Sequence, residues 1–178
     1  MMCFSLQGYP VYYHQLYKID FAKLKERGVT KEHLLRHALF LKEYIFAHVE
    51  PNEEDGQIIT VLDVKGMGLA DVAGEALELW KTHSKVLQSH YIERSHQIFV
   101  VNASSMFRMI WKLVKPVLVG STKRKVKIFR EGADLGRLVR CVGTHQLPGE
   151  YGGPARVVLG DSEEERLLAL FVNRLHAV

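Results

Sequence analysis

The chain has 178 residues, of which 47% are hydrophobic and 25% are charged, as is typical of a folded globular protein. With 24 Lys and Arg against 20 Asp and Glu, the formal net charge is only +4, which argues against intrinsic disorder. No apolar run is long enough to span a bilayer, and the first residues lack a basic stretch followed by an apolar run, so no secretory signal is expected. The two cysteines, Cys3 and Cys141, are far apart and suit a reducing compartment, so we expect a single cytoplasmic domain.

Segments typical of strands alternate along the chain with segments typical of helices. Strands rich in aromatic and β-branched residues are predicted at 10–13, 57–64, 97–103, 126–129 and 156–159. Helices are predicted at 30–49, 70–91, 104–119 and 133–142, with a last one starting at Asp161 or Ser162. This alternation predicts an α/β fold with a mostly parallel sheet of about five strands, flanked by helices. Residues 1–8 are expected to be a flexible start before a domain at 9–178.

The predicted helix at 104–119 has bulky apolar side chains around much of its circumference. These residues are Met106, Phe107, Ile110, Trp111, Leu113, Val114, Val117 and Leu118. Burial in an ordinary core explains one apolar face of a helix, but less easily this wider distribution. Pro116 is expected to kink or end the helix.

Basic residues gather just after this apolar segment. They are Lys112, Lys115, Lys123, Arg124, Lys125, Lys127 and Arg130. Such a segment can meet anionic lipid headgroups or nucleic acid, or it can simply form a solvated face.

Catalytic and metal-binding motifs are weak in this sequence. Gly66-Met-Gly68 follows a predicted strand, but it lacks the third glycine of a dinucleotide site and the Gly-Lys-Ser/Thr of a phosphate-binding loop. No Gly-x-Ser-x-Gly elbow and no His-Glu-x-x-His pair occur. His33 and His37 have a spacing compatible with metal binding, and Cys141 lies four residues before His145, but neither pair has a further ligand or base in sequence. We therefore expect no enzyme and no metal site.

Six segments in order between Tyr9 and Gly153 resemble the CRAL-TRIO family of lipid-binding domains, and in particular the fungal phosphatidylinositol/phosphatidylcholine transfer proteins. The segments are Pro10–Tyr13, Val61–Gly66, Tyr91–Ser95, Ile98–Ala103, Trp111–Leu118 and Leu147–Gly153. The resemblance implies a sheet that floors an apolar pocket and a mobile gate helix opposite. It assigns the gate and pocket to Met106, Phe107, Ile110, Trp111, Val114 and Val117. The small helical domain that normally precedes this domain in the family has no counterpart here.

The resemblance also implies residues for two headgroups. Glu93, Thr122 and Lys125 stand where relatives contact inositol phosphate, and Arg94 completes the Tyr-x-Glu-Arg motif. Tyr12, Tyr44 and Thr60 match polar positions for phosphatidylcholine, but Ile58 replaces an expected serine. The usual Asp-Pro after the gate is Val119-Gly120 here, which changes the local turn.

These features predict a protein that binds a single phospholipid and transfers or presents it between membranes. Phosphatidylinositol is the favoured lipid. The lipid is the expected ligand, and no cofactor is expected. The expected partners are that lipid and, transiently, an anionic membrane surface, but no nucleic acid. We therefore expect the protein to be cytoplasmic and peripherally associated with membranes. Two alternatives stay open. The cargo could be a retinoid, tocopherol, sterol or haem, or the domain could be a scaffold for a small GTPase or membrane partner.

Overall fold

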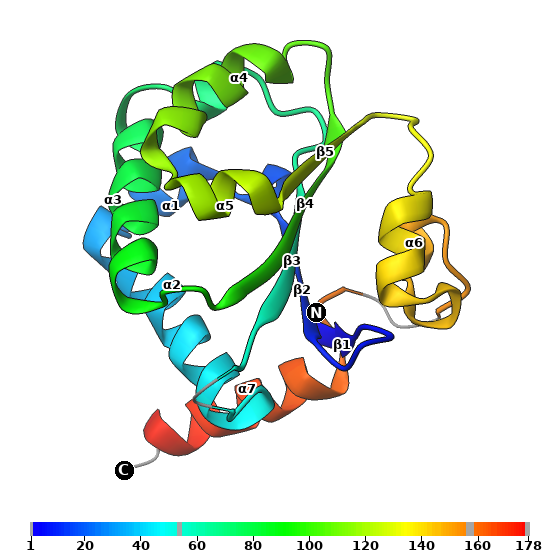
Figure 1. Ribbon diagram of the computed structural model, residues 1–178. Coiled ribbons are helices and arrows are strands. Elements are labelled where there is room, and N and C mark those ends of the chain that lie inside the picture. The colour runs from blue at the N-terminus through cyan, green and yellow to red at the C-terminus, as the bar shows by residue number, and fades with distance from the viewer. Residues whose placement is uncertain (1, 53–54, 156–158, 177–178) are drawn as a thin grey trace.

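The fold is built around one twisted, mostly parallel sheet (Figure 1). The computed structural model describes residues 2–52, 55–155 and 159–176. The strands are β1 (Met2–Phe4), β2 (Pro10–Gln15), β3 (Ile58–Asp63), β4 (Ser95–Ala103) and β5 (Val126–Arg130). They lie in the order β1-β2-β3-β4-β5, with β2 to β5 parallel and β1 antiparallel to β2. The predicted α/β class is confirmed.

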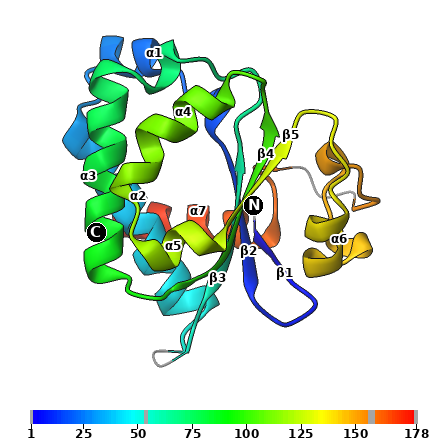
Figure 2. The ribbon, with the colours of Figure 1, turned by 45° about the horizontal axis from the view of Figure 1, so that its top comes forward.

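Helices cover the sheet unequally. The helices are α1 (Phe21–Glu26), α2 (Lys31–Tyr44), α3 (Gly74–His90), α4 (Phe107–Val114), α5 (Gly120–Lys125), α6 (Gly136–Val142) and α7 (Glu163–His176). Short helical turns occur at Leu16–Lys18, Ile45–Val49, Ala70–Val72, Lys115–Val117, Thr144–Gln146 and Gly149–Tyr151. Consecutive parallel strands are neighbours, so their crossovers all pass on one side, where α1 to α5 gather, while α6 lies on the other side (Figures 1 and 2).

The side chains of the central strands divide between these two sides. Residues of odd number point towards α6 and form a buried core with it; they are Val11, Tyr13, Ile59, Val61, Phe99 and Val101. Residues of even number face α2 to α5; they include Tyr12, Thr60, Leu62, Ile98 and Val100. Both faces are covered, which explains why the strand at 57–64 reads as nearly continuous in apolar residues.

A polar network ties the sheet to the turn at Gly149–Tyr151. The Tyr151 hydroxyl donates to Oδ2 of buried Asp63 at 3.1 Å, and Asn102 Nδ2 donates to Oδ1 at 2.9 Å. The Lys65 backbone N–H donates to the same Oδ1 at 3.0 Å. At Gly153 a Cβ would lie 1.8 Å from the Leu147 carbonyl oxygen, so only glycine fits this turn. Three of the six resembling segments, Val61–Gly66, Ile98–Ala103 and Leu147–Gly153, therefore meet around one carboxylate.

Several local predictions are refined or corrected. The start at 1–8 was expected to be flexible, but Met2–Phe4 instead pairs with β2, with Cys3 opposite Val11. The helix predicted at 104–119 ends at Val114 because Pro116 lies in the following 3-10 turn. Helices α1 and α5 had no counterpart among the predictions. Most of the strand predicted at 156–159 lies outside the described residues.

Two further observations limit the possible roles of the helices. Thr30 caps α2, since its Oγ1 accepts from the His33 N–H at 3.3 Å, while His33 Nδ1 accepts from the Thr30 N–H at 3.2 Å. His33 is thus part of a helix cap. Among the described helices, none has the length and apolar character needed to cross a bilayer.

Candidate functional site

A cavity of about 420 Å³ lies between the sheet and helices α2 to α5. The even-numbered residues of β2, β3 and β4 form its floor, and helices α2, α3 and α4 form its walls. Most of the lining side chains are apolar, and the volume is within the range of sites that bind small molecules. The arrangement can therefore enclose the apolar part of a ligand.

Helix α4 is apolar towards the cavity and also towards solvent. Phe107, Ile110, Trp111 and Val114 line the cavity. On the outer side Met106 is 48% exposed, while Met109 and Leu113 are each 43% exposed. Of the six residues predicted for the gate and pocket, Met106 points outward, and Val117 is half-buried in the turn after the helix rather than part of the lining.

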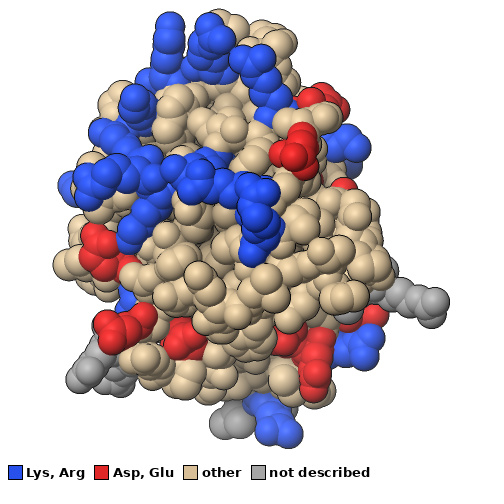
Figure 3. Space-filling view, turned by 45° about the vertical axis from the view of Figure 1, so that its right-hand side comes forward, with Lys and Arg blue, Asp and Glu red and all other residues tan. Residues whose placement is uncertain are grey.

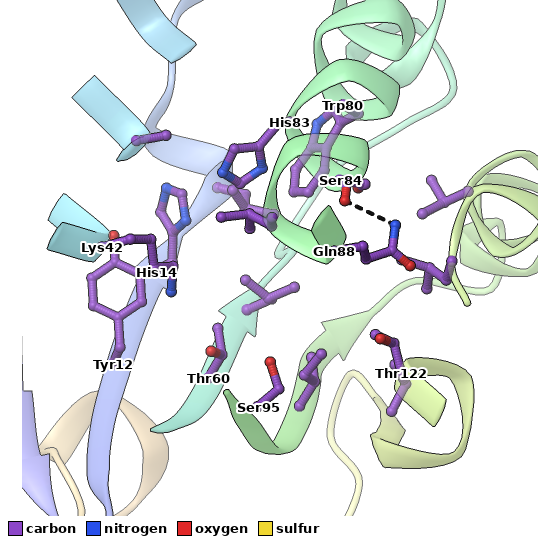
Figure 4. A pocket seen from close by; sticks show the side chains of 18 of the residues that line it. Tyr12, His14, Lys42, Thr60, Trp80, His83, Ser84, Gln88, Ser95 and Thr122 are labelled. Atoms are coloured by element: carbon purple, nitrogen blue, oxygen red, sulfur yellow. Dashed lines mark hydrogen bonds between the residues drawn. The ribbon is translucent and has the colours of Figure 1, made fainter. Parts of the chain in front are cut away.

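The side chain of Gln88 connects α3 to the segment between α4 and α5. Its Nε2 donates to the carbonyl of Val117 at 3.1 Å and to that of Ser84 at 2.8 Å, the latter drawn in Figure 4. Its Oε1 accepts from the Val119 N–H. One amide therefore satisfies the backbone on both sides of Leu118, where the chain leaves the turn after α4.

Glu93, Thr122 and Lys125 meet at one end of the cavity, here named the Lys125 end. Lys125 Nζ lies 2.6 Å from Glu93 Oε2, and the hydrogen bond from Lys125 holds the pKa of the Glu93 carboxyl below its usual range. Thr122 precedes Lys125 by three residues in α5, so both project from the same side of the helix. All three line the cavity.

Arg94 is directed at the loop before β3. Its Nη1 donates to the carbonyls of Asn52 at 2.6 Å and Gly56 at 3.0 Å, and its guanidinium carbon lies 5.0 Å from the centroid of the Phe46 ring. These contacts brace the connection from α2 to the sheet. A direct role for Arg94 at a headgroup stays a prediction.

The opposite end of the cavity, here named the Lys42 end, carries Tyr12 and His14 from β2, Lys42 from α2 and His83 from α3 (Figure 4). Lys42 Nζ lies 5.0 Å from the centroid of the Tyr12 ring. Burial lowers the pKa of Lys42 to about 8, and burial lowers the pKa of both His14 and His83 to about 4. At pH 7, two neutral imidazoles and one ammonium therefore line this end of a mostly apolar cavity.

The second predicted headgroup set is only partly assembled. Tyr12 and Thr60 line the cavity, and so does Ile58. Tyr44 instead packs against Phe171 of α7, with ring centroids 5.6 Å apart. Sequence reasoning missed Lys42, His14 and His83. One signal was available, because Lys42 follows Ala38 by four residues and so interrupts the apolar stripe of the predicted helix.

Residues 3–153 of the chain match the CRAL/TRIO domain. The chain belongs to the CRAL/TRIO family. In this CRAL/TRIO domain the six resembling segments contribute to strands β2, β3 and β4, to helix α4 and to the turn at Gly149–Tyr151, and the predicted membership is confirmed.

Named relatives agree with this membership. The chain is 28% identical over 152 residues to phosphatidylinositol/phosphatidylcholine transfer protein SFH4 of Arabidopsis thaliana, covering 83% of this chain and 25% of that protein. It is 26% identical over 156 residues to SEC14 cytosolic factor of Candida glabrata, covering 84% of this chain and 51% of that protein. The chain thus spans about a quarter to a half of these relatives. The crystal structure of Sfh5 has the same fold, with a TM-score of 0.70 at 19% identity over 99% of this chain and 64% of that one.

Proposed function

We propose that this CRAL/TRIO domain binds one phospholipid, phosphatidylinositol, in its cavity and transfers or presents it between membranes. The observation that carries the proposal is the cavity itself, a mostly apolar space of about 420 Å³ with polar groups at its ends and an outwardly apolar helix as one wall. Two relatives from Arabidopsis thaliana are named phosphatidylinositol/phosphatidylcholine transfer proteins, which supports the same class of ligand.

The energetics of acyl chains fit such a carrier. Each methylene group removed from water contributes about 0.8 kcal/mol, whether it enters a bilayer or an apolar cavity. Exchange between the two environments is therefore close to balanced and needs no covalent step. It needs a wall that opens, and α4 is suited to this because it presents apolar side chains to both the cavity and its surroundings.

The Lys125 end supplies groups that complement an inositol phosphate. The Lys125 ammonium can pair with the phosphodiester, and the Thr122 hydroxyl can donate to a phosphate oxygen. The Glu93 carboxylate can accept hydrogen bonds from inositol hydroxyls. In the ligand-free protein Lys125 and Glu93 neutralise each other, so the headgroup would exchange one set of polar partners for another.

Docking to a membrane would use the surface around α4 and α5. A groove lined by Lys115, Lys123, Arg124, Lys127 and Arg137, together with Trp111 of α4 and Phe129 of β5, lies on this surface. Figure 3 shows Lys and Arg side chains gathered across the upper part of this face. Each basic residue near an anionic bilayer contributes about 1 kcal/mol.

The decisive experiment is native mass spectrometry of the purified protein followed by lipid extraction. We expect a one-to-one complex with phosphatidylinositol, and we expect Lys125→Ala to lose most of its transfer to acceptor vesicles. Lys81→Ala is the matched control, because Lys81 pairs with Glu78 on α3 away from the cavity lining. Recovery of no phospholipid, together with no transfer by the wild-type protein, would exclude the proposal.

Haem is a second candidate, favoured by the His14 and His83 side chains that line the cavity. A neutral imidazole nitrogen directed into an apolar pocket is a suitable axial ligand. Purified protein that carries a haem absorption band, lost in His14→Ala or His83→Ala, would establish this cargo; colourless protein that carries phospholipid would exclude it. The scaffold alternative predicts a cavity filled by its own large side chains, whereas the structure has an open one.

A further inference from the structure

The Lys42 end of the cavity carries a positive charge that is not paired with an acidic residue of the described lining, whereas Lys125 at the other end pairs with Glu93. We propose that this end is a subsite for an anionic polar group of an amphiphile, a carboxylate or a phosphate, held by the Lys42 ammonium with His14 and His83 as hydrogen-bonding partners. The proposal rests on the proposed function, because it describes a second polar position in the same lipid cavity.

The charge of Lys42 has no counter-charge within the cavity. Glu93 is the one acidic residue among the described residues of the lining, and it pairs with Lys125 at the opposite end. Lys42 is half-buried and lines the cavity, and burial lowers the pKa of its ammonium. An ammonium in such surroundings is unfavourable unless an anion accompanies it. A ligand is the available source of that anion.

The two histidines add hydrogen-bonding capacity at the same place. His14 projects from β2 and His83 from α3, so they approach the Lys42 end from two sides (Figure 4). The Nε2 atom of His83 is buried and has no hydrogen-bond partner among the residues that the structure describes. Buried polar atoms are normally paired. A ligand oxygen bound to Lys42 would provide the missing partner for an imidazole N–H.

The same geometry disfavours a choline headgroup. A trimethylammonium group needs the face of an aromatic ring, and the Lys42 ammonium already lies 5.0 Å from the centroid of the Tyr12 ring. A second cation there would be repelled by the first. Ile58, buried beside Thr60, also offers no hydroxyl. The chemistry of the Lys42 end therefore selects an anion rather than choline.

The test compares single-chain lipids in competition with a fluorescent fatty acid at pH 7. Oleate, lysophosphatidate and lysophosphatidylcholine share the acyl chain and differ in the polar group. We expect the wild-type protein to bind at least one of the two anionic lipids about tenfold more tightly than the choline lipid, a ratio that corresponds to about 1.4 kcal/mol. The tighter of the two anionic lipids then identifies carboxylate or phosphate as the group.

Three variants make the result specific to the charge of Lys42. Lys42→Met, which keeps length and apolar volume, should remove the preference, whereas Lys42→Arg should keep it. Lys81→Met, on the outer side of α3, is the control for a general loss of positive charge. An equal preference in wild type and Lys42→Met would overturn the anionic subsite.

The outcomes also separate this inference from the proposed function. If wild-type protein binds phosphatidylinositol but shows no preference for anionic single-chain lipids, the subsite is excluded and the proposed function stands. If wild-type protein binds no lipid at all, both are excluded. Thermal unfolding of each variant verifies that a loss of binding is not a loss of folding; we expect Lys42→Met to fold, because it removes a buried charge.

Discussion

Lys125 Nζ lies 2.6 Å from Glu93 Oε2, so an ion pair joins α5 to the turn between α3 and β4 at one end of the cavity. Both residues also line the cavity. An ion pair with this much exposure to solvent contributes little to folding, because solvent screens the attraction. The pair would then matter for ligand binding, because it places one ammonium and one carboxylate at the end of the cavity.

Replacing Glu93 by Gln tests this pair. The amide keeps the size of the side chain but loses the charge that orients Lys125, so we expect transfer of phosphatidylinositol to fall by about tenfold. The midpoint of unfolding in urea should stay close to that of the wild type, because solvent screens an exposed pair. Glu78→Gln, which breaks the comparable Lys81 pair, should leave transfer unchanged. Equal transfer by wild type and Glu93→Gln would show that the pair has no part in headgroup binding.

Replacing Gln88 by Ala tests the connection after the gate helix. The variant frees the Val119 N–H and the Val117 carbonyl, so the segment between α4 and α5 should open more readily. We expect faster hydrogen–deuterium exchange over residues 115–119 and lipid transfer several-fold faster than wild type. Ser89→Ala, on the exposed side of α3, is the control. Unchanged exchange at these residues would contradict a latching role for Gln88.

The outer side of α4 can be tested by adding a charge. Met109→Asp should reduce binding to anionic vesicles by about tenfold, because an exposed apolar contact is lost and like charges repel. Leu170→Asp makes the same kind of change on α7, at the other end of the molecule (Figure 1), and should bind as wild type does. Vesicle co-sedimentation measures both. A loss of the same size in the two variants would contradict docking through α4.

The hydrogen bond from Tyr151 to Asp63 lies on the side of the sheet away from the cavity. Tyr151→Phe leaves Oδ2 of a buried carboxylate without this donor, so the free energy of unfolding should fall by about 1–3 kcal/mol. Tyr17→Phe is the control, since Tyr17 is exposed. Urea denaturation gives the comparison. Lipid selectivity should be the same in Tyr151→Phe and wild type, and a changed selectivity would mean that the network also shapes the cavity.

The buried histidines predict how stability depends on pH in the ligand-free protein. Burial lowers the pKa of His14 and of His83 from 6.5 to about 4. Between these values the unfolded chain binds more protons than the folded one, so the free energy of unfolding falls as the pH falls from 6.5 towards 4. From pH 7 to pH 5, His83→Gln should lose about 2 kcal/mol less than wild type. The exposed His145, changed to Gln, is the control; equal losses in wild type and His83→Gln would show that His83 is not held neutral by the fold.

Much of the architecture could be predicted from local patterns. Alternating strand and helix segments set the α/β class, and the excess of apolar residues from Met106 to Leu118 marked the gate helix. The order of the six segments marked the family. These features are carried by residues close in the chain, so periodicity and turn chemistry reveal them directly.

The tertiary structure decided which polar side chains line the cavity. Lys42, His14 and His83 lie on three different elements and come together only because the crossovers place α2 and α3 over β2 and β3. The same packing turned Met106 outward, directed Arg94 to the carbonyls of Asn52 and Gly56, and set Tyr44 against α7. The sequence by itself determined the α/β class and an unusually apolar helix after β4, since burial follows from residue type and spacing. Which polar groups face that pocket depends on the direction of each side chain after packing, and this is a property of contacts between residues far apart in the chain.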